Sequence, residues 1–548
     1  MSLYYFTLFS QWEQFFSLGK GQVMDSQKGK QEIVYQIYPK SFCDSSGDGI
    51  GDLRGILKHL DYLSDLGVTM LWICPVYASP MDDNGYDVSD YYAVHPMFGT
   101  MEDLEKLIDE AGIRGMKIMM DLVLNHTSDE HVWFQNALRD PKSRYRDYYI
   151  FKKSRNGRPP SNLRSVFGGS VWEPVEGTEE YYFHSFSKRQ PDLNWENEDM
   201  RKELYEMIRW WMKKGIAGFR VDAINFIKKD HTFPDGKPDG RDGLASCLPY
   251  VRNVKGIEAF LRELKNQVFD PLDCVTVSEA VDVPYSSLGD YIGKQGCFSM
   301  MFDFSYTNFD LEGKDEKWYK RKTWTTEEFR ELLFKSQEEI QKTGWPAVFI
   351  ENHDQPRAVS KFFPDKKDQT YEAASMLAAM YFFLRGTPFI YQGQELGTTN
   401  VWKDSVCEFD DIESRGQYLS ALSDGCTKEE ALYYINLRSR DNAREMMDWK
   451  EAETQEKEEQ SVLKFYKKMT ALRKQEPCLI YGKFIPYREY GKEVVAYERN
   501  DGFTRFLILC NFSRRTKKIG VRGGEILLSN QPVKEKILRP FQVILIKD

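Results

Sequence analysis

The sequence predicts an α/β protein built on a (β/α)8 barrel, the TIM-barrel architecture, with an inserted subdomain after strand three and a C-terminal antiparallel β domain. After residue 30, eight short apolar runs alternate with amphipathic helical segments, and most of the runs end in polar or charged residues. Near-continuous apolar runs are typical of strands buried on both faces of a parallel sheet. Because eight strand–helix units close such a barrel, their number favours this architecture.

The elements of the predicted barrel follow one another along the chain. The expected strands are Ile33–Tyr38, Val68–Pro75, Lys117–Leu124, Ile216–Ala223, Val275–Ala280, Ser299–Phe304, Ala347–Glu351 and Pro388–Tyr391. Apolar residues recur at helical spacing in the intervening segments Leu53–Asp65, Met101–Gly112, Asp199–Lys214, Ile257–Phe269, Thr326–Thr343 and Thr370–Arg385. We therefore expect the barrel to comprise residues 31–126 and 198–474.

Two segments depart from this alternation. About 70 residues rich in Pro, Gly, Ser, Arg and aromatic residues separate Leu124 from the helical pattern near Asp199, and a structureless loop of that length is rare in a compact domain. Residues 127–197 are therefore predicted to form an inserted subdomain. From residue 475, short alternating runs surround the turn Asn500-Asp501-Gly502, which is a hairpin signal. Residues 475–548 are predicted to form a C-terminal β-sandwich.

The first 30 residues are expected to be a peripheral or non-native extension. Residues 1–23 are aromatic but are broken by Gln11, Glu13 and Gln14, and they lack the basic start and small-residue cleavage site of a signal peptide. Met24, followed by DSQKGK, would make a natural start.

Composition excludes several classes of function. The chain of 548 residues carries 75 basic and 84 acidic side chains, a net charge of −9, whereas a nucleic-acid-binding protein needs a basic surface. The sequence has no run of about eighteen apolar residues that could span a membrane. Its nine cysteines include no C-x-x-C pair and indicate a reducing compartment. We expect a cytoplasmic monomer or weak homo-oligomer without nucleic-acid or membrane partners.

Acidic side chains stand at the ends of three predicted strands. Asp222 and Glu279 each end one strand, and Asp354 follows a third in the sequence Glu351-Asn352-His353-Asp354. In such barrels the active site lies at the C-terminal strand ends, so these acids should converge. A single acid there is explained as a helix cap, but three at one mouth are not. Two carboxyl groups flanking a glycosidic bond are enough to hydrolyse it.

A basic side chain accompanies the first of these acids. Period-two alternation places Arg220 on the same side of its strand as Asp222, so its guanidinium can keep that carboxylate ionised. Like charges brought together raise the pKa of at least one carboxyl, so one acid stays protonated while another is ionised. The residues by themselves thus favour a glycosidase.

Five short motifs together resemble the α-amylase superfamily (glycoside hydrolase family thirteen), and within it the oligo-1,6-glucosidase and α-glucosidase group. The resemblance extends from about residue 30 to the C-terminus. The motifs are DLVLNH (Asp121–His126), GFRVDAI (Gly218–Ile224), SEA (Ser278–Ala280), ENHD (Glu351–Asp354) and QPDLN (Gln190–Asn194). The last looks like the version typical of the oligo-1,6-glucosidase group.

The resemblance implies a role for each acid. Asp222 would be the nucleophile that forms a β-glucosyl ester, Glu279 the general acid and then the general base, and Asp354 a binder of sugar hydroxyls that stabilises the distorted transition state. The residues that match hydrogen-bonding partners of the glucose next to the cleavage point are His126, Arg220 and His353.

The resemblance also implies a closed pocket end. Asp83 and Tyr86 of DDNGYD match the acid and the stacking tyrosine that grip the non-reducing end. Arg440 of SRDNAR matches the partner of that acid, with Arg444 close by. An acid–arginine pair across the pocket end restricts attack to chain termini. Two displacements at one carbon retain configuration, so α-glucose is the expected first product.

The loop of residues 44–52 resembles a calcium loop. Its oxygen ligands would come from Asp44, Ser46, Asp48, the Ile50 carbonyl and Asp52. An EF-hand is excluded because Gly55 stands where the bidentate Glu would be, and the family usually has Asn at the position of Ser46. One structural Ca²⁺ is thus expected, with no cofactor for catalysis. The alternative interpretation is a Gly-rich acidic turn.

Two departures from the family leave the substrate open. Ala223 follows the nucleophile, where strict α-1,6 enzymes usually carry Val and α-1,4-preferring relatives a smaller or polar residue, and this conflicts with QPDLN. The second is the segment NAREMMDW (Asn442–Trp449), where the family commonly continues with Thr-Pro-Met-Gln-Trp. Linkage preference and the outer-subsite contacts therefore stay open.

We therefore predict a retaining, exo-acting α-glucosidase that hydrolyses terminal α-1,6 and/or α-1,4 glucosidic bonds of short isomalto- or malto-oligosaccharides. A trehalose-6-phosphate hydrolase would need basic residues around the aglycone site, for which only the run Lys152–Arg158 is a candidate. A sucrose-isomerising or transglucosylating enzyme also stays open, because loop geometry decides whether water or a sugar resolves the ester. A non-catalytic transporter-associated or carbohydrate-binding barrel is disfavoured by the three acids.

Overall fold

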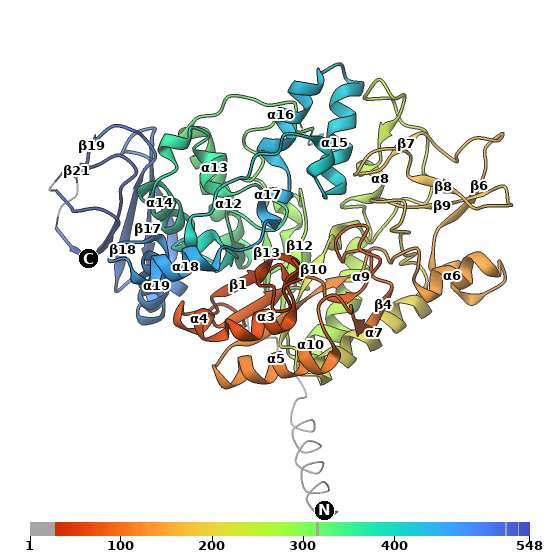
Figure 1. The fold of residues 1–548 in the computed structure, drawn as a ribbon, viewed down its shortest axis with the longest axis horizontal. Coiled ribbons are helices and arrows are strands. Elements are labelled where there is room, and N and C mark those ends of the chain that lie inside the picture. Colours follow the sequence, from red (N-terminus) through yellow and green to blue (C-terminus); the bar gives the residue numbers. More distant parts are fainter. Residues whose placement is uncertain (1–27, 314–316, 521–522, 535) are drawn as a thin grey trace, which may run out of the picture.

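A computed structural model describes residues 28–313, 317–520, 523–534 and 536–548, and it confirms the predicted barrel (Figure 1). Eight parallel strands follow one another around the barrel, and the last pairs with the first through Phe389 and Val34. They are β1 (Val34–Ile37), β2 (Met70–Ile73), β5 (Lys117–Val123), β10 (Gly218–Asp222), β12 (Val275–Glu279), β13 (Met300–Phe302), β14 (Pro346–Val348) and β15 (Thr387–Tyr391). Most of the expected N-terminal extension, residues 1–27, lies outside the described residues.

Alternation along the strands separates the inside of the barrel from its helical cover. Inward-facing Trp72, Met119, Phe302 and Phe389 belong to one apolar cluster that fills the barrel. Their outward-facing neighbours pack against the helices in the main core. On β10 the same alternation directs Arg220 and Asp222 inward, next to the inward-facing polar end of β5.

The covering helices begin and end close to the predicted positions. They include α5 (Met101–Ile113), α7 (Glu198–Lys213), α9 (Ile257–Leu264) with its π-helical continuation Lys265–Phe269, α12 (Thr326–Thr343) and α14 (Tyr371–Phe382). The predicted helix Leu53–Asp65 is instead two helices, α3 (Leu53–Lys58) and α4 (Leu60–Asp65). His59, between the two helices, departs from helical geometry (φ −110°, ψ 15°). Its ring stacks on that of Trp449, with 3.4 Å between the ring centroids.

The segment after the third strand forms its own small structure. It contains α6 (Val132–Arg139) and a three-stranded sheet in the order β6 (Phe151–Lys153), β9 (Glu180–Phe183) and β8 (Trp172–Pro174). Another of its strands, β7 (Leu163–Arg164), pairs in parallel with β11 (Ala245–Ser246), which belongs to the loop after the fourth barrel strand. Two excursions from neighbouring strands are thus joined above the barrel mouth.

The C-terminal part contains a five-stranded antiparallel sheet. Its strands, in order, are β16 (Lys483–Tyr487), β17 (Val494–Asn500), β18 (Arg505–Asn511), β22 (Val543–Lys547) and β20 (Glu525–Ser529). One face packs on the barrel, where the Tyr497 hydroxyl donates to the Met380 carbonyl of α14 at 2.8 Å. The other face packs in an apolar cluster that includes Leu538 of the small strand β21 (Ile537–Leu538). In Figure 1 this sheet and the insertion lie at opposite ends of the molecule.

A further excursion, after β15, was not predicted. It contains the neighbouring helices α15 (Ile412–Ser423) and α16 (Lys428–Arg438), followed by the short α17 (Asp441–Arg444), and it stands over the barrel in Figure 1. Helices α18 (Trp449–Lys457), α19 (Val462–Gln475) and α20 (Pro477–Tyr481) then lead to the C-terminal sheet. Within the described parts of the chain, no helix has both the length and the apolar character needed to cross a membrane.

Candidate active site

A cavity of about 270 Å³ opens at the C-terminal ends of the barrel strands. Seven of the predicted site residues line it, namely Asp83, Tyr86, His126, Asp222, Glu279, Asp354 and Arg440. The remaining three, Arg220, His353 and Arg444, contact the lining carboxylates directly. The structure therefore brings together all ten residues that the sequence analysis placed in one site.

Arg220 lies between three carboxylates. Its Nη1 is 2.8 Å from Asp222 Oδ1 and 2.7 Å from Asp121 Oδ1, and its Nη2 is 2.6 Å from Glu279 Oε1. Asp121 and Glu279 belong to β5 and β12, the strands on either side of β10, so the barrel register itself builds this cluster. The second oxygen of Glu279 accepts the Ala223 N–H at 3.0 Å.

Burial and the charges around Arg220 determine how Asp222 and Asp121 titrate. Burial raises the pKa of Asp222 well above its usual value, and the neighbouring carboxylates raise it further. Arg220 lowers this pKa, as expected, but by less than the other two effects raise it. Burial likewise raises the pKa of Asp121 to about 6. Because the carboxyl groups of Asp222 and Asp121 share one nitrogen of the guanidinium, these two groups titrate as a unit. The cluster keeps a proton at a pH where an isolated carboxyl would lose it.

Asp354 has the opposite environment. Its Oδ2 is 3.0 Å from His353 Nε2, and its Oδ1 is 2.9 Å from Arg444 Nη2 and 3.4 Å from Arg440 Nη1. Burial would raise the pKa of Asp354, but these neighbours lower it below its usual range. Burial lowers the pKa of His353 to about 3, so the two arginines supply the positive charge there at neutral pH. One side of the cavity thus retains a proton and the other an anion.

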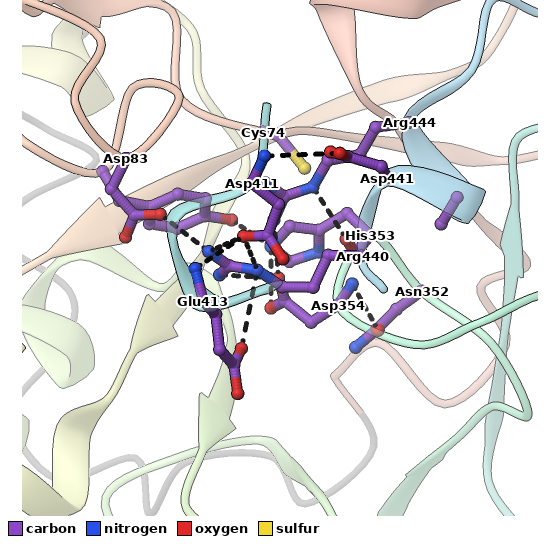
Figure 2. A network of polar contacts seen from close by, with 12 residues as sticks. Cys74, Asp83, Asn352, His353, Asp354, Asp411, Glu413, Arg440, Asp441 and Arg444 are labelled. Carbon is purple, nitrogen blue, oxygen red and sulfur yellow. Dashed lines mark hydrogen bonds and ion pairs between the residues drawn. The ribbon is translucent and has the colours of Figure 1, made fainter. Parts of the chain in front are cut away.

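The predicted acid–arginine pair forms within the lining of the cavity. Arg440 Nη2 lies 3.0 Å from Asp83 Oδ1. Figure 2 shows the guanidinium among four carboxylates, those of Asp83, Asp354, Asp411 and Glu413. The other oxygen of Asp83 accepts from Gln190 Nε2 at 3.2 Å. The Tyr86 ring stacks on His353 with 5.4 Å between centroids, and its hydroxyl donates to Asp121 at 2.9 Å. An aromatic ring and a charged pair therefore line the cavity together.

Comparison with known proteins decides the family. Residues 36–482 match the family described as "Alpha amylase, catalytic domain". The chain belongs to this family. It is 40% identical to an oligo-1,6-glucosidase of Parageobacillus thermoglucosidasius, over 94% of this chain and 98% of that protein. It is 39% identical to an oligo-1,6-glucosidase of Bacillus cereus, over 96% of this chain and 100% of that protein. The solved structure of isomaltulose synthase from Klebsiella sp. LX3 is 35% identical with a TM-score of 0.88, covering 95% of this chain and 99% of that one.

As a member of the α-amylase family the protein is a glycoside hydrolase, and several residues that contact the cavity-lining pair Asp83 and Arg440 were not predicted from the sequence. Asp411 at the start of α15 accepts from Arg440 Nε at 2.7 Å. Phe167 of the insertion lies 5.3 Å from the Arg440 guanidinium, and Gln190 bonds Asp83. Gln190 stood within the recognised QPDLN segment, but nothing local indicated its partner. Asp411 precedes a helix, where an aspartate is fully explained as a cap.

The predicted calcium ligands lie in the loop of residues 44–52. The loop offers only oxygen donors, as Ca²⁺ prefers. Its carboxylates are engaged by the backbone: Asp44 accepts the N–H groups of Gly47 at 2.6 Å and Gly49 at 2.8 Å, and Asp52 accepts that of Gly55 at 2.6 Å. Among the described residues, no group of three or more His, Cys, Asp or Glu side chains is arranged to hold a metal. The predicted set also includes the Ser46 hydroxyl and the Ile50 carbonyl, so calcium binding by this loop stays a prediction.

Proposed function

We propose that this glycoside hydrolase is a retaining, exo-acting α-glucosidase that releases glucose from terminal α-1,6 or α-1,4 bonds of short oligosaccharides. The observation that carries the proposal is the placement of Asp222 and Glu279 on the two terminal nitrogens of one guanidinium, at a cavity whose lining contains the ion pair of Asp83 with Arg440. The oligo-1,6-glucosidase relatives, which match nearly the whole chain, support the same substrate class.

In the first step of the proposed reaction, Asp222 attacks the anomeric carbon while Glu279 gives its proton to the glycosidic oxygen. The bond to the departing sugar breaks and a β-glucosyl ester forms on Asp222. The negative charge therefore leaves Asp222 and arises on Glu279. Since Arg220 contacts both carboxylates, at 2.8 Å and 2.6 Å, the charge moves from one end of the guanidinium to the other and stays neutralised throughout.

In the second step, the Glu279 carboxylate takes a proton from water, and the resulting hydroxide oxygen attacks the anomeric carbon. The ester bond breaks, Asp222 is released as a carboxylate, and Glu279 is again protonated. Two inversions return the α configuration, so α-glucose is the product. Asp354, held ionised by Arg444 at 2.9 Å, stabilises the positive charge that develops on the sugar ring in both steps.

Exo action follows from the closed end of the cavity. We infer that the ion pair between Asp83 and Arg440, both in the cavity lining, blocks a chain that continues beyond the terminal glucose. The paired side chains offer an acceptor and a donor that suit the hydroxyl groups of a terminal sugar. Cleavage therefore begins at the non-reducing end.

The cations around the cavity favour a neutral aglycone over trehalose-6-phosphate. Among the described residues, the five cationic side chains that line the cavity are each within 3.0 Å of a carboxylate. The pairs are Arg164–Asp242, Arg252–Asp282, Lys317–Asp424, Arg438–Asp310 and Arg440–Asp83. The basic run Lys152–Arg158 does not line the cavity. A phosphate would have to compete with an existing ion pair at every one of these positions.

Two experiments test this proposal. Asp222→Asn keeps the shape of the side chain and should abolish glucose release from p-nitrophenyl α-glucoside, whereas near-normal turnover would refute the assignment. Wild-type enzyme should then be offered isomaltose, maltose, sucrose, trehalose and trehalose-6-phosphate in parallel. We expect hydrolysis of isomaltose or maltose; cleavage of trehalose-6-phosphate alone, or isomerisation of sucrose, would replace the proposal by that activity.

The cellular setting is inferred from the cysteines. All nine are free thiols, and seven of them are buried, which suits a reducing compartment. We infer a cytoplasmic enzyme that works as a monomer or weak homo-oligomer, and size-exclusion chromatography coupled to light scattering measures the latter directly.

A further inference from the structure

We propose that Asp411 is a positioning residue that holds Arg440 in the orientation that closes the cavity, and thereby fixes where the non-reducing end of the substrate stops. The inference rests on the exo function proposed above. It assigns a task to the excursion after β15, which the sequence analysis left without one. Asp411 touches Arg440 and not the cavity itself, so its effect on the reaction passes through Arg440.

The contacts of Arg440 show what Asp411 contributes. Arg440 donates through Nε to Asp411 Oδ1 at 2.7 Å, and its Nη2 lies 2.5 Å from the same carboxylate. That Nη2 also lies 3.0 Å from Asp83 Oδ1. One edge of the guanidinium is thus held by Asp411, and this hold aims the shared nitrogen at Asp83 (Figure 2). A planar group held along one edge by two contacts cannot rotate about its long axis.

Asp411 is itself fixed by its place at the start of α15. It is fully buried, and its side chain caps the helix by accepting the N–H groups of Glu413 at 3.2 Å and Ser414 at 3.0 Å. The Ser414 hydroxyl donates to it at 2.5 Å. Both carboxylate oxygens of Asp411 therefore accept hydrogen bonds from α15 in addition to their contacts with Arg440. These bonds fix the orientation of the carboxylate that binds Arg440.

The helices on either side are joined at the base of the excursion. Ser414 on α15 and Ser439, which follows α16, bond through their hydroxyls at 2.8 Å. Asp441 Oδ2 accepts the Asp410 N–H at 2.8 Å. The start of α15 and the start of α17 thus form one unit, which carries Asp411 on one side and Arg440 on the other.

A close helix–loop contact holds this unit against the insertion. A side-chain carbon at Gly416 of α15 would lie only 2.4 Å from the Phe167 carbonyl oxygen, so glycine is needed for the helix to approach the loop. The Phe167 ring in turn lies 5.3 Å from the Arg440 guanidinium. Arg440 is therefore confined between a carboxylate edge on α15 and an aromatic ring of the insertion.

Asp83 depends on this arrangement. It is buried, and burial raises its pKa, an effect that the charges of Arg440 and Arg444 oppose. If Arg440 turned away, Asp83 would lose its nearest cation and would bind sugar hydroxyls more weakly. The loss of Arg440 should affect Asp354 less, because Arg444 Nη2 is 2.9 Å from Asp354 Oδ1 while Arg440 Nη1 is 3.4 Å from it. Binding of the terminal glucose should therefore suffer more than the chemical steps.

The test is the variant Asp411→Asn, which keeps a good helix cap but removes the charge. We expect KM for p-nitrophenyl α-glucoside to rise about tenfold, the effect of weakening one charge-assisted hydrogen bond, with kcat changed much less. The matched control is Asp448→Asn, because exposed Asp448 caps α18 through the N–H groups of Lys450 and Glu451, each at 3.0 Å, and lies outside the cavity. This control should leave KM unchanged.

A double-variant cycle separates positioning from a general structural role. If Asp411 acts through Arg440, then Asp411→Asn should add nothing to KM once Arg440→Met is present; additive effects would overturn the inference. An unchanged KM in Asp411→Asn, while Asp222→Asn is inactive, would overturn it and leave the proposed function standing. Asp411→Ser, which also caps a helix, is the second variant, and failure of both to fold while Asp448→Asn folds would show a purely structural role and likewise overturn it.

Discussion

Replacing Arg220 by lysine should move the acid limb of the pH profile of kcat/KM to higher pH. The guanidinium contacts Asp222 and Asp121 through Nη1 and Glu279 through Nη2, at 2.6–2.8 Å. Lysine has a single nitrogen on a shorter side chain, so it cannot bind all three carboxylates at once. Without its ion pair to residue 220, the ionised form of Asp222 is less stable, and the pKa of Asp222 rises further.

The size of this shift follows from the strength of that ion pair. One charge-assisted hydrogen bond is worth about 1.5–3 kcal/mol, and about 1.4 kcal/mol corresponds to one pKa unit. The acid limb should therefore move up by about 1–2 pH units, and kcat/KM on the acid side should fall about 10- to 100-fold. Part of this decrease should be recovered as the pH rises and the nucleophile ionises.

The assay is kcat/KM for p-nitrophenyl α-glucoside across the acid and neutral range, for wild type and variant. The control is Arg473→Lys, because Arg473 is also fully buried but donates to the backbone carbonyls of Leu479 and Gly386. Its pH midpoint should equal that of wild type. A loss of activity in Arg220→Lys that is the same at every pH, with an unmoved midpoint, would refute the electrostatic role given to Arg220.

Three further measurements probe other parts of the molecule. Ala223→Val adds two methyl groups to a residue that lines the cavity and should raise the ratio of isomaltose to maltose hydrolysis; an unchanged ratio would remove this residue from the linkage question. Asp310→Asn leaves buried Arg438, 2.6 Å away, without its charged partner and should cost about 3–5 kcal/mol of unfolding free energy at neutral pH. Burial raises the pKa of Asp310, but Arg438 and other cations lower it to about 2. The stabilisation by ionised Asp310 is therefore complete above about pH 4 and is lost towards pH 2. The difference in unfolding free energy between wild type and variant should shrink over that range, and a constant difference would contradict this prediction. Calcium at about 100 times its Kd should add about 2.7 kcal/mol to stability if the loop of residues 44–52 binds it, and equal melting temperatures in calcium and in chelator would contradict the calcium prediction.

The barrel and its acids could be predicted from the sequence because both are encoded locally. A strand buried on two faces is a continuous apolar run, and an acid such as Asp222 or Glu279 at the end of such a run must lie at the barrel mouth. The direction of the Arg220 side chain followed from period-two alternation. The net pKa of Asp222 did not, because it depends on carboxylates from two other strands and on burial.

The remaining parts of the site depend on contacts between distant segments. Asp83 and Gln190 are separated by 107 positions, and Arg440 meets Asp83 across 357. The β7–β11 pairing joins two loops that have no shared pattern. His59 breaks a helix in which its neighbours fit the period, and its ring packs between those of Trp449 and Phe42. No local sequence pattern encodes such partners, because these distant segments come together only when the barrel closes.

The most direct measurement of the central claim is covalent trapping of the glucosyl ester. A fluorinated α-glucosyl fluoride that forms the ester faster than water cleaves it should label wild-type enzyme once, and peptide mass spectrometry should place the sugar on Asp222. Asp222→Asn should remain unlabelled, and NMR of the wild-type reaction should show α-glucose first. A label on another residue, or β-glucose as the first product, would contradict the account.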